Sequence, residues 1–115
     1  MKKEYRLLKN QDFKTVLDTH RCVSRENARV FYKINALGHC RVGVSVSSKI
    51  GNSVVRHKLK RQVTSMLDKC VPIEAALDLV VIVKQKYKEN SYQENYEIIQ
   101  KIVYDILKRR VANEK

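Results

Sequence analysis

Residues 41–61 read RVGVSVSSKIGNSVVRHKLKR and change from one hydrophobic period to another along their length. Val42, Val44 and Val46 alternate with other residues, which is the period of a strand with one buried face. We therefore expect a strand at Arg41–Ser47 with its valines turned toward the core.

A helix pattern follows the Gly51-Asn52-Ser53 interruption. Asn52 or Ser53 is a suitable N-cap, and the pattern predicts a helix from about Ser53 to Lys69. Its core-facing stripe consists of apolar residues at steps of three and four: Val55, Leu59, Val63, Met66, Leu67 and Cys70.

Upstream of this stretch the sequence predicts one helix and two strands. A short helix is expected at Gln11–Asp18, with Asn10 as its cap and an apolar side formed by Phe13, Val16 and Leu17.

Ala28–Ile34 alternates as a strand, and a weaker strand is expected at Arg21–Ser24. The Ala28–Ile34 strand has Arg29, Phe31 and Lys33 on one face and Ala28, Val30, Tyr32 and Ile34 on the other. Because residues 36–39 can form a turn, we expect Ala28–Ile34 and Arg41–Ser47 to pair as a hairpin.

Downstream, Leu79–Val83 is apolar at every position, which favours a central strand covered on both faces. Ser91 and Glu94 match a capping box, and a helical stripe runs toward Arg110. That stripe consists of Tyr92, Tyr96, Ile99, Val103 and Ile106.

The elements follow the order αβββαβα and predict an α+β fold with a mixed four-stranded sheet. The strands on either side of the Ser53–Lys69 helix should be parallel, and general rules favour a right-handed crossover.

The composition indicates a single folded domain spanning residues 1–115. The chain has 43% hydrophobic and 31% charged residues with 3 Gly and 1 Pro, which excludes collagen-like and disordered classes. The longest apolar run, Leu79–Val83, is too short for a membrane span, and the N-terminus lacks the apolar stretch of a secretory signal. Cys22, Cys40 and Cys70 have no metal-ligand spacing, so we expect free thiols and a cytoplasmic protein.

The charge distribution points to a polyanionic partner. The formal net charge is +12, and no acidic residue lies between Glu26 and Asp68. That interval holds eight basic residues, which are Arg29, Lys33, Arg41, Lys49, Arg56, Lys58, Lys60 and Arg61. A solvated helix face is the alternative to a binding surface, but like charges at i and i+4 oppose each other, which favours nucleic acid as the compensating partner.

Two rows of side chains define a basic ridge on the predicted helix: Arg56 with Lys60, and His57 with Arg61. Residues 51–53 at the helix start suit phosphate binding, although turn formation and capping explain them equally well. The histidines His20, His39 and His57 fall in unlike settings, and no nucleophile with its base stands out. We therefore expect no protein-based active site.

Residues 41–61 closely resemble the signature of the bacterial ribonuclease P protein component, in which a hydrophobic strand leads to lysine, glycine and asparagine and then to a basic helix. The resemblance implies a small subunit that binds a catalytic RNA and the 5′ leader of precursor tRNA, while the RNA hydrolyses the phosphodiester with Mg²⁺ bound mainly through the RNA. It also implies a left-handed crossover. The RNA-binding residues would be Lys49, Gly51, Asn52, Arg56, His57, Lys58, Lys60 and Arg61, and the leader cleft would contain Phe13, Leu17, Arg29, Phe31 and Lys33.

Four residues depart from the family pattern. Ser48, His57 and Thr64 replace a usual Lys, Asn and Arg, and Leu17 replaces an aromatic residue. Ordinary core packing remains an alternative role for Phe13 and Leu17.

A ribosomal or other structural RNA-binding protein, or a DNA-binding helix protein, would share the size and charge, but neither requires the spacing of residues 51–61. The resemblance therefore implies no membrane or DNA partner.

Overall fold

The computed structural model describes residues 1–113, with side chains to residue 109. Its helices are α1 (Asn10–Leu17), α2 (Ser53–Cys70) and α3 (Tyr92–Asn113), with short 3-10 helices η1 (Lys3–Tyr5) and η2 (Gln85–Glu89). Its strands are β1 (Cys22–Ser24), β2 (Ala28–Ile34), β3 (Arg41–Ser45) and β4 (Leu77–Val83). The predicted α+β order is confirmed. None of the described helices has the length and apolar content needed to cross a bilayer.

The four strands form one mixed sheet in the order β1-β2-β4-β3. Strand β4 pairs antiparallel with β2 and parallel with β3, so Val80 lies opposite both Phe31 and Gly43. The predicted hairpin between β2 and β3 is therefore wrong. Strand β4 separates them because it is buried along nearly its whole length and occupies the centre of the sheet. The residues between β2 and β3 bridge the width of one strand instead of closing a tight turn.

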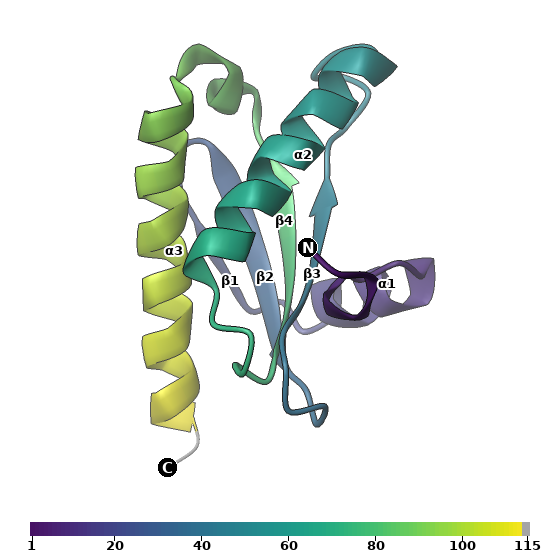
Figure 1. Cartoon of the computed structure of the whole chain (residues 1–115). Helices are drawn as coiled ribbons and strands as arrows, with labels where there is room; N and C mark the ends of the chain where they lie inside the picture. Colours follow the sequence, from purple (N-terminus) through teal and green to yellow (C-terminus); the bar gives the residue numbers. More distant parts are fainter. Residues whose placement is uncertain (114–115) are drawn as a thin grey trace.

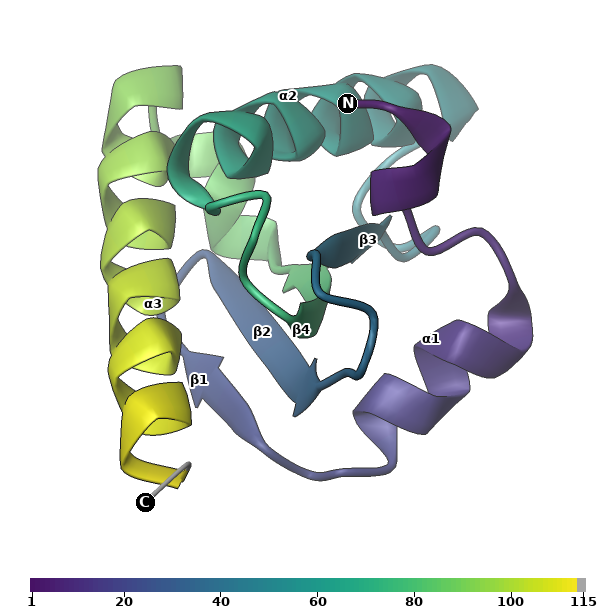
Figure 2. The same cartoon turned by 60° about the horizontal axis from the view of Figure 1, so that its bottom comes forward.

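The β3-α2-β4 connection is left-handed. Figure 1 shows α2 in front of the sheet, with β3 and β4 both pointing upward and β4 to the left of β3, and Figure 2 keeps α2 on the same side. A right-handed crossover, which is the strong general preference, would place β4 on the other side of β3. The handedness implied by the family resemblance is thus the one observed.

The sheet separates two apolar clusters of unequal size. Helices α2 and α3 cover one face and build the larger core, while α1 packs on the other face (Figures 1 and 2). The smaller cluster on the α1 side contains the buried Leu7, Val16 and Val80 with the half-buried Phe13, Leu17, Phe31 and Ile82. Because α1 is short, it covers only part of its face, and residues such as Arg29 remain exposed there.

The ends of the helices mostly follow their sequence signals. The Asn52 side chain accepts a hydrogen bond from the N–H of Val55 (3.0 Å). In the capping box, the N–H of Glu94 donates to Ser91 Oγ (3.1 Å) and the N–H of Ser91 donates to Glu94 Oε1 (2.8 Å). Asn10, in contrast, is the first residue of α1 and makes no cap, because the helix begins one residue earlier than predicted.

Tyr92 departs from its predicted place in the core stripe of α3. The side chain is 37% exposed, whereas Ile99, Val103 and Ile106 of the same stripe are buried. Figure 1 shows the reason: α2 crosses the sheet obliquely, so that its C-terminal end lies beside α3 and its N-terminal end lies away from it. The first turn of α3 is therefore left without a complete cover.

Candidate nucleic-acid interface

The basic ridge occupies the exposed side of α2, opposite the buried Leu59, Val63, Met66 and Leu67. His57, Lys58, Lys60 and Arg61 are all exposed. Arg56 is half-buried, and its Nε atom is buried without a hydrogen-bond partner among the described residues. The predicted ridge residues therefore lie on one helix face, and the guanidinium of Arg56 is partly buried there.

The loop before α2 is held in place by two side chains from η2. Gln85 Nε2 donates to the carbonyl of Lys49 (2.9 Å), and Lys88 Nζ donates to the carbonyl of Ile50 (2.6 Å). These bonds fix the backbone between Lys49 and the helix cap Asn52. Sequence reasoning missed Gln85 and Lys88, because nothing in their local pattern indicates a contact with a loop more than thirty residues away.

Gly51 is required by close packing at the start of α2. A Cβ at this position would lie 2.9 Å from a methyl group of Val55, which is closer than carbon atoms approach in proteins. Lys49 and Asn52 are exposed on either side of it. The loop therefore presents its polar residues next to the ridge while Val55 closes over the glycine.

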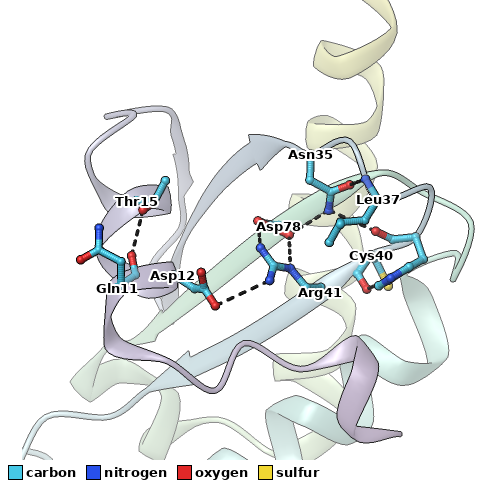
Figure 3. A network of polar contacts seen from close by, with 9 residues as sticks. Gln11, Asp12, Thr15, Asn35, Leu37, Cys40, Arg41 and Asp78 are labelled. Atoms are coloured by element: carbon cyan, nitrogen blue, oxygen red, sulfur yellow. Dashed lines mark hydrogen bonds and ion pairs between the residues drawn. The ribbon is translucent and has the colours of Figure 1, made fainter.

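Arg41 does not belong to the free charge of this surface. Its guanidinium pairs with the buried carboxylate of Asp78, at 2.7 Å from Nη2 to Oδ2 and 3.0 Å from Nε to Oδ1. A longer contact of 3.6 Å joins Nη1 to Asp12 of α1 (Figure 3). The sequence interval without acidic residues is real, but both partners lie outside it. The absence of acidic residues from this interval predicts no counter-charge for any of its eight basic residues, and this prediction is wrong for Arg41.

The predicted leader cleft lies on the α1 face of the sheet. The ring of Phe13 packs so closely on Gly43 that any Cβ at residue 43 would collide with it. Leu17 and Phe31 belong to the same small cluster. Phe13 and Leu17 thus have the packing role that was the alternative to leader binding, while each also retains partial exposure.

Phe31 lies between two cations on β2. Residues 29, 31 and 33 share one face of the strand, and Arg29 is exposed while Phe31 and Lys33 are half-buried. All five predicted cleft residues therefore lie on α1 and on the strand face beneath it, on the opposite side of the sheet from α2 (Figure 2).

Arg6 lies where the α2 ridge meets the predicted leader cleft, a position that no local pattern in the sequence indicates. The N–H of Leu7 donates to the carbonyl of Val42 (2.8 Å), which holds the N-terminal segment against the outer edge of β3. Arg6 and Lys60 line a hollow of about 220 Å³ that also reaches Phe13 and Gly43. Arg6 thereby adds positive charge beside Thr64, the position where a basic residue is usual in the family pattern.

The protein residues do not fit a Mg²⁺ site. Within residues 1–113, no three His, Cys, Asp or Glu side chains are grouped so that they could hold a metal ion. Asp12 of α1 and Asp78 of β4 are both paired with Arg41. The three cysteines are free thiols, and burial raises the pKa of Cys70 to about 11.

Comparisons with known proteins agree on one family. The family model described as Ribonuclease P matches residues 1–107. The chain is 31% identical to the ribonuclease P protein component of Mesoplasma florum, over 94% of this chain and all of that protein. It is 37% identical to the corresponding protein of Streptococcus thermophilus, over 84% of this chain and 86% of that one.

A solved structure gives the same result. The RNase P protein of Staphylococcus aureus, in a mutant with defective mRNA degradation activity, aligns with a TM-score of 0.82 at 28% identity, covering 90% of this chain and 89% of that one. The family match, the relatives and the shared fold together show that this chain belongs to the ribonuclease P proteins, the protein component of the enzyme that processes the 5′ leader of precursor tRNA.

Proposed function

We propose that the chain binds the ribonuclease P RNA through the α2 ridge and its preceding loop, and binds the 5′ leader of precursor tRNA on the α1 face. The observation that carries the proposal is the ridge together with the neighbouring Lys58, because His57, Lys58, Lys60 and Arg61 are exposed on one helix face. Cations with no salt-bridge partner among the described residues favour a polyphosphate as the compensating charge.

The loop from Lys49 to Asn52 completes this RNA-binding surface. Gln85 and Lys88 occupy two of its carbonyl oxygens, so the loop is fixed before RNA arrives and loses little conformational freedom on binding. Preorganisation of this kind is useful for a subunit that must recognise one large folded RNA.

The α1 face suits a single-stranded leader. Single-strand binders place an aromatic ring beside cations, so that a base stacks on the ring while neighbouring phosphates meet the charges. Phe31 between Arg29 and Lys33 has this arrangement, and Phe13 and Leu17 form the wall on the α1 side. The leader would therefore contact a surface separate from the ridge.

The RNA subunit would supply the catalytic centre, with Mg²⁺ held mainly by RNA. No step is assigned to a protein side chain, because the three histidines are dispersed and Asp12 and Asp78 are paired with Arg41. The site of action proposed for the chain is the cytoplasm, where it would have no need of a membrane or DNA partner.

Reconstitution tests this proposal. RNA-free chain, in vitro transcribed ribonuclease P RNA and Mg²⁺ are combined with a precursor tRNA, and kcat/KM is measured for each combination. The RNA should cleave with higher kcat/KM when the chain is present, and the chain alone should not cleave. Cleavage by the RNA-free chain would contradict the proposal, and so would a kcat/KM of the RNA that does not change when the chain is added. A structural RNA-binding protein such as a ribosomal protein would give the second result.

A further inference from the structure

A second hollow borders the ridge on the side away from the N-terminal segment. It lies between α2 and the first turn of α3 and has a volume of about 460 Å³. It is separate from the α1 face, which is on the other side of the sheet (Figure 2). The hollow is lined mainly by Val54, His57, Lys58, Arg61, Gln62 and Tyr92.

Tyr92 supplies an aromatic surface to this hollow. Its ring contacts Tyr96 at 6.4 Å between centroids, and Lys69 Nζ lies 5.5 Å from its centroid. Neither Tyr96 nor Lys69 lines the hollow, so these contacts support the ring from elsewhere and leave part of it facing the open space. With 37% of the side chain exposed, an aromatic surface is available to a partner.

Gln62 supplies an oriented amide. Its Oε1 accepts a hydrogen bond from the hydroxyl of Tyr87 (3.0 Å), and Tyr87 is only 2% exposed. Because the amide oxygen is held by a buried hydroxyl, the NH₂ group of Gln62 remains as a donor at the hollow. A donor fixed in this way suits an acceptor on the edge of a nucleobase.

The permanently charged side chains that line the hollow, Lys58 and Arg61, are both cations. His57, Lys58 and Arg61 line it, and no Asp or Glu does. A ring, an oriented amide and two permanent cations together are the groups with which proteins hold an unstacked nucleotide: the ring stacks on the base and the cations meet its phosphates. A duplex offers phosphates to the same cations but no free base face to the ring.

We infer that this hollow binds an unpaired nucleotide of the RNA partner, with its base on Tyr92, its edge toward Gln62 and its phosphates toward Lys58 and Arg61. The inference rests on the proposed function, because it requires that the exposed face of α2 meets RNA. It adds that the contact between α2 and RNA includes an unpaired nucleotide bound by stacking, at a place distinct from the leader cleft.

Fluorescence tests the stacking directly, since the chain contains no tryptophan. Tyr92→Trp and the matched control Tyr104→Trp, which changes another exposed tyrosine of α3, each introduce a single tryptophan. The probes are a labelled single-stranded oligoadenylate and a labelled blunt RNA hairpin with the same number of phosphates. Anisotropy of the label reports binding, and tryptophan emission reports stacking.

The oligoadenylate should quench the emission of Tyr92→Trp at saturation, the hairpin should not, and Tyr104→Trp should respond to neither. In a Phe31→Leu background, which removes the stacking ring of the leader cleft, Tyr92→Leu should weaken oligoadenylate binding roughly 5- to 100-fold, Tyr92→Phe should retain it, and Tyr104→Leu should have no effect. Binding without quenching in Tyr92→Trp, or equal quenching by both probes, would overturn the inference alone. If neither probe binds the unmodified chain, both the inference and the proposed function fail.

Discussion

Arg41 and Asp78 are direct partners across β3 and β4, and their side chains form a two-point ion pair with distances of 2.7 and 3.0 Å. Asp78 is 3% exposed and also accepts a hydrogen bond from Asn35 Nδ2 at 2.8 Å (Figure 3). The hydrogen bond from Arg41 to Asp78 raises the pKa of the guanidinium above its already high ordinary value, so Arg41 carries a full positive charge in this pair. This pair fixes the register of the two parallel strands at the end where α1 packs.

Arg41→Met should destabilise the fold by about 3 kcal/mol, because it leaves the buried Asp78 carboxylate without its cation while keeping an apolar stem of similar length. Urea unfolding followed by circular dichroism measures the change. The matched control is Arg25→Met, which breaks an ion pair with Asp105 whose side chains are 45% and 37% exposed. That change should cost less than about 1 kcal/mol. Equal losses in the two variants would show that burial of Asp78 does not set the energy.

The start of α3 should show a pH dependence that comes from Glu94. Hydrogen bonds from the backbone and hydroxyl of Ser91 lower the pKa of this carboxyl below its ordinary 4.5 in the folded state. A carboxylate with a lowered pKa stabilises the fold above its ordinary pKa, and the stabilisation is lost as pH falls through the folded value. The free energies of unfolding of Glu94→Gln and of the unmodified chain should therefore differ near pH 7 and converge as the pH falls below 4.5. The exposed Glu97→Gln serves as the control, and a constant difference at all pH values would exclude the capping box as its source.

Gln85 should affect RNA binding without touching RNA. Gln85→Ala removes the hydrogen bond to the Lys49 carbonyl, so the loop before α2 gains freedom that RNA binding must then remove. One such bond corresponds to about 0.5–1.5 kcal/mol, or an affinity loss of roughly 2- to 10-fold for ribonuclease P RNA. Gln93→Ala, an exposed glutamine on α3, is the control. Indistinguishable affinities for the two variants would mean that the loop needs no support from η2.

The sequence predicts the helices and strands more reliably than it predicts which of them lie next to each other. The alternation of apolar residues correctly predicts β2 and β3 as strands. The two do not pair, because the apolar strand β4, which comes later in the chain, occupies the central position between them. Period and turn residues describe contacts along the chain, whereas strand order depends on which strand buries both of its faces. The left-handed crossover likewise came from resemblance and not from any pattern in the residues.

The same limit applies to the candidate site. The ridge was predictable because Arg56, Lys60 and their neighbours lie on one helix, where spacing determines the face. Arg6 and Gln85 reach the surface through tertiary contacts that leave no local trace. Tyr92 continued the apolar stripe by spacing, but the oblique path of α2 leaves it exposed. Helical spacing predicts a face and does not predict where the covering helix ends.

Phe31 should distinguish leader-bearing from leaderless substrates. Phe31→Leu keeps apolar packing with Phe13 and Leu17 but removes the ring on which a base would stack. Loss of stacking is worth about 1–3 kcal/mol, so the variant holoenzyme should bind precursor tRNA roughly tenfold more weakly and mature tRNA as before. Titration with precursor tRNAs of increasing leader length measures this. The same loss for mature tRNA would assign Phe31 to packing only.

The salt dependence of binding to ribonuclease P RNA tests the central claim, that the α2 ridge is the RNA-binding surface, most directly. Each phosphate contact contributes about 0.7–0.9 to the slope of log affinity against log salt. Lys60→Ala combined with Arg61→Ala should therefore reduce the slope by roughly 1.4–1.8 and weaken binding, with unchanged thermal unfolding because both residues are exposed. Lys108→Ala, at an exposed position of α3, should leave the slope unchanged. A double variant with the slope and affinity of the unmodified chain would contradict the claim.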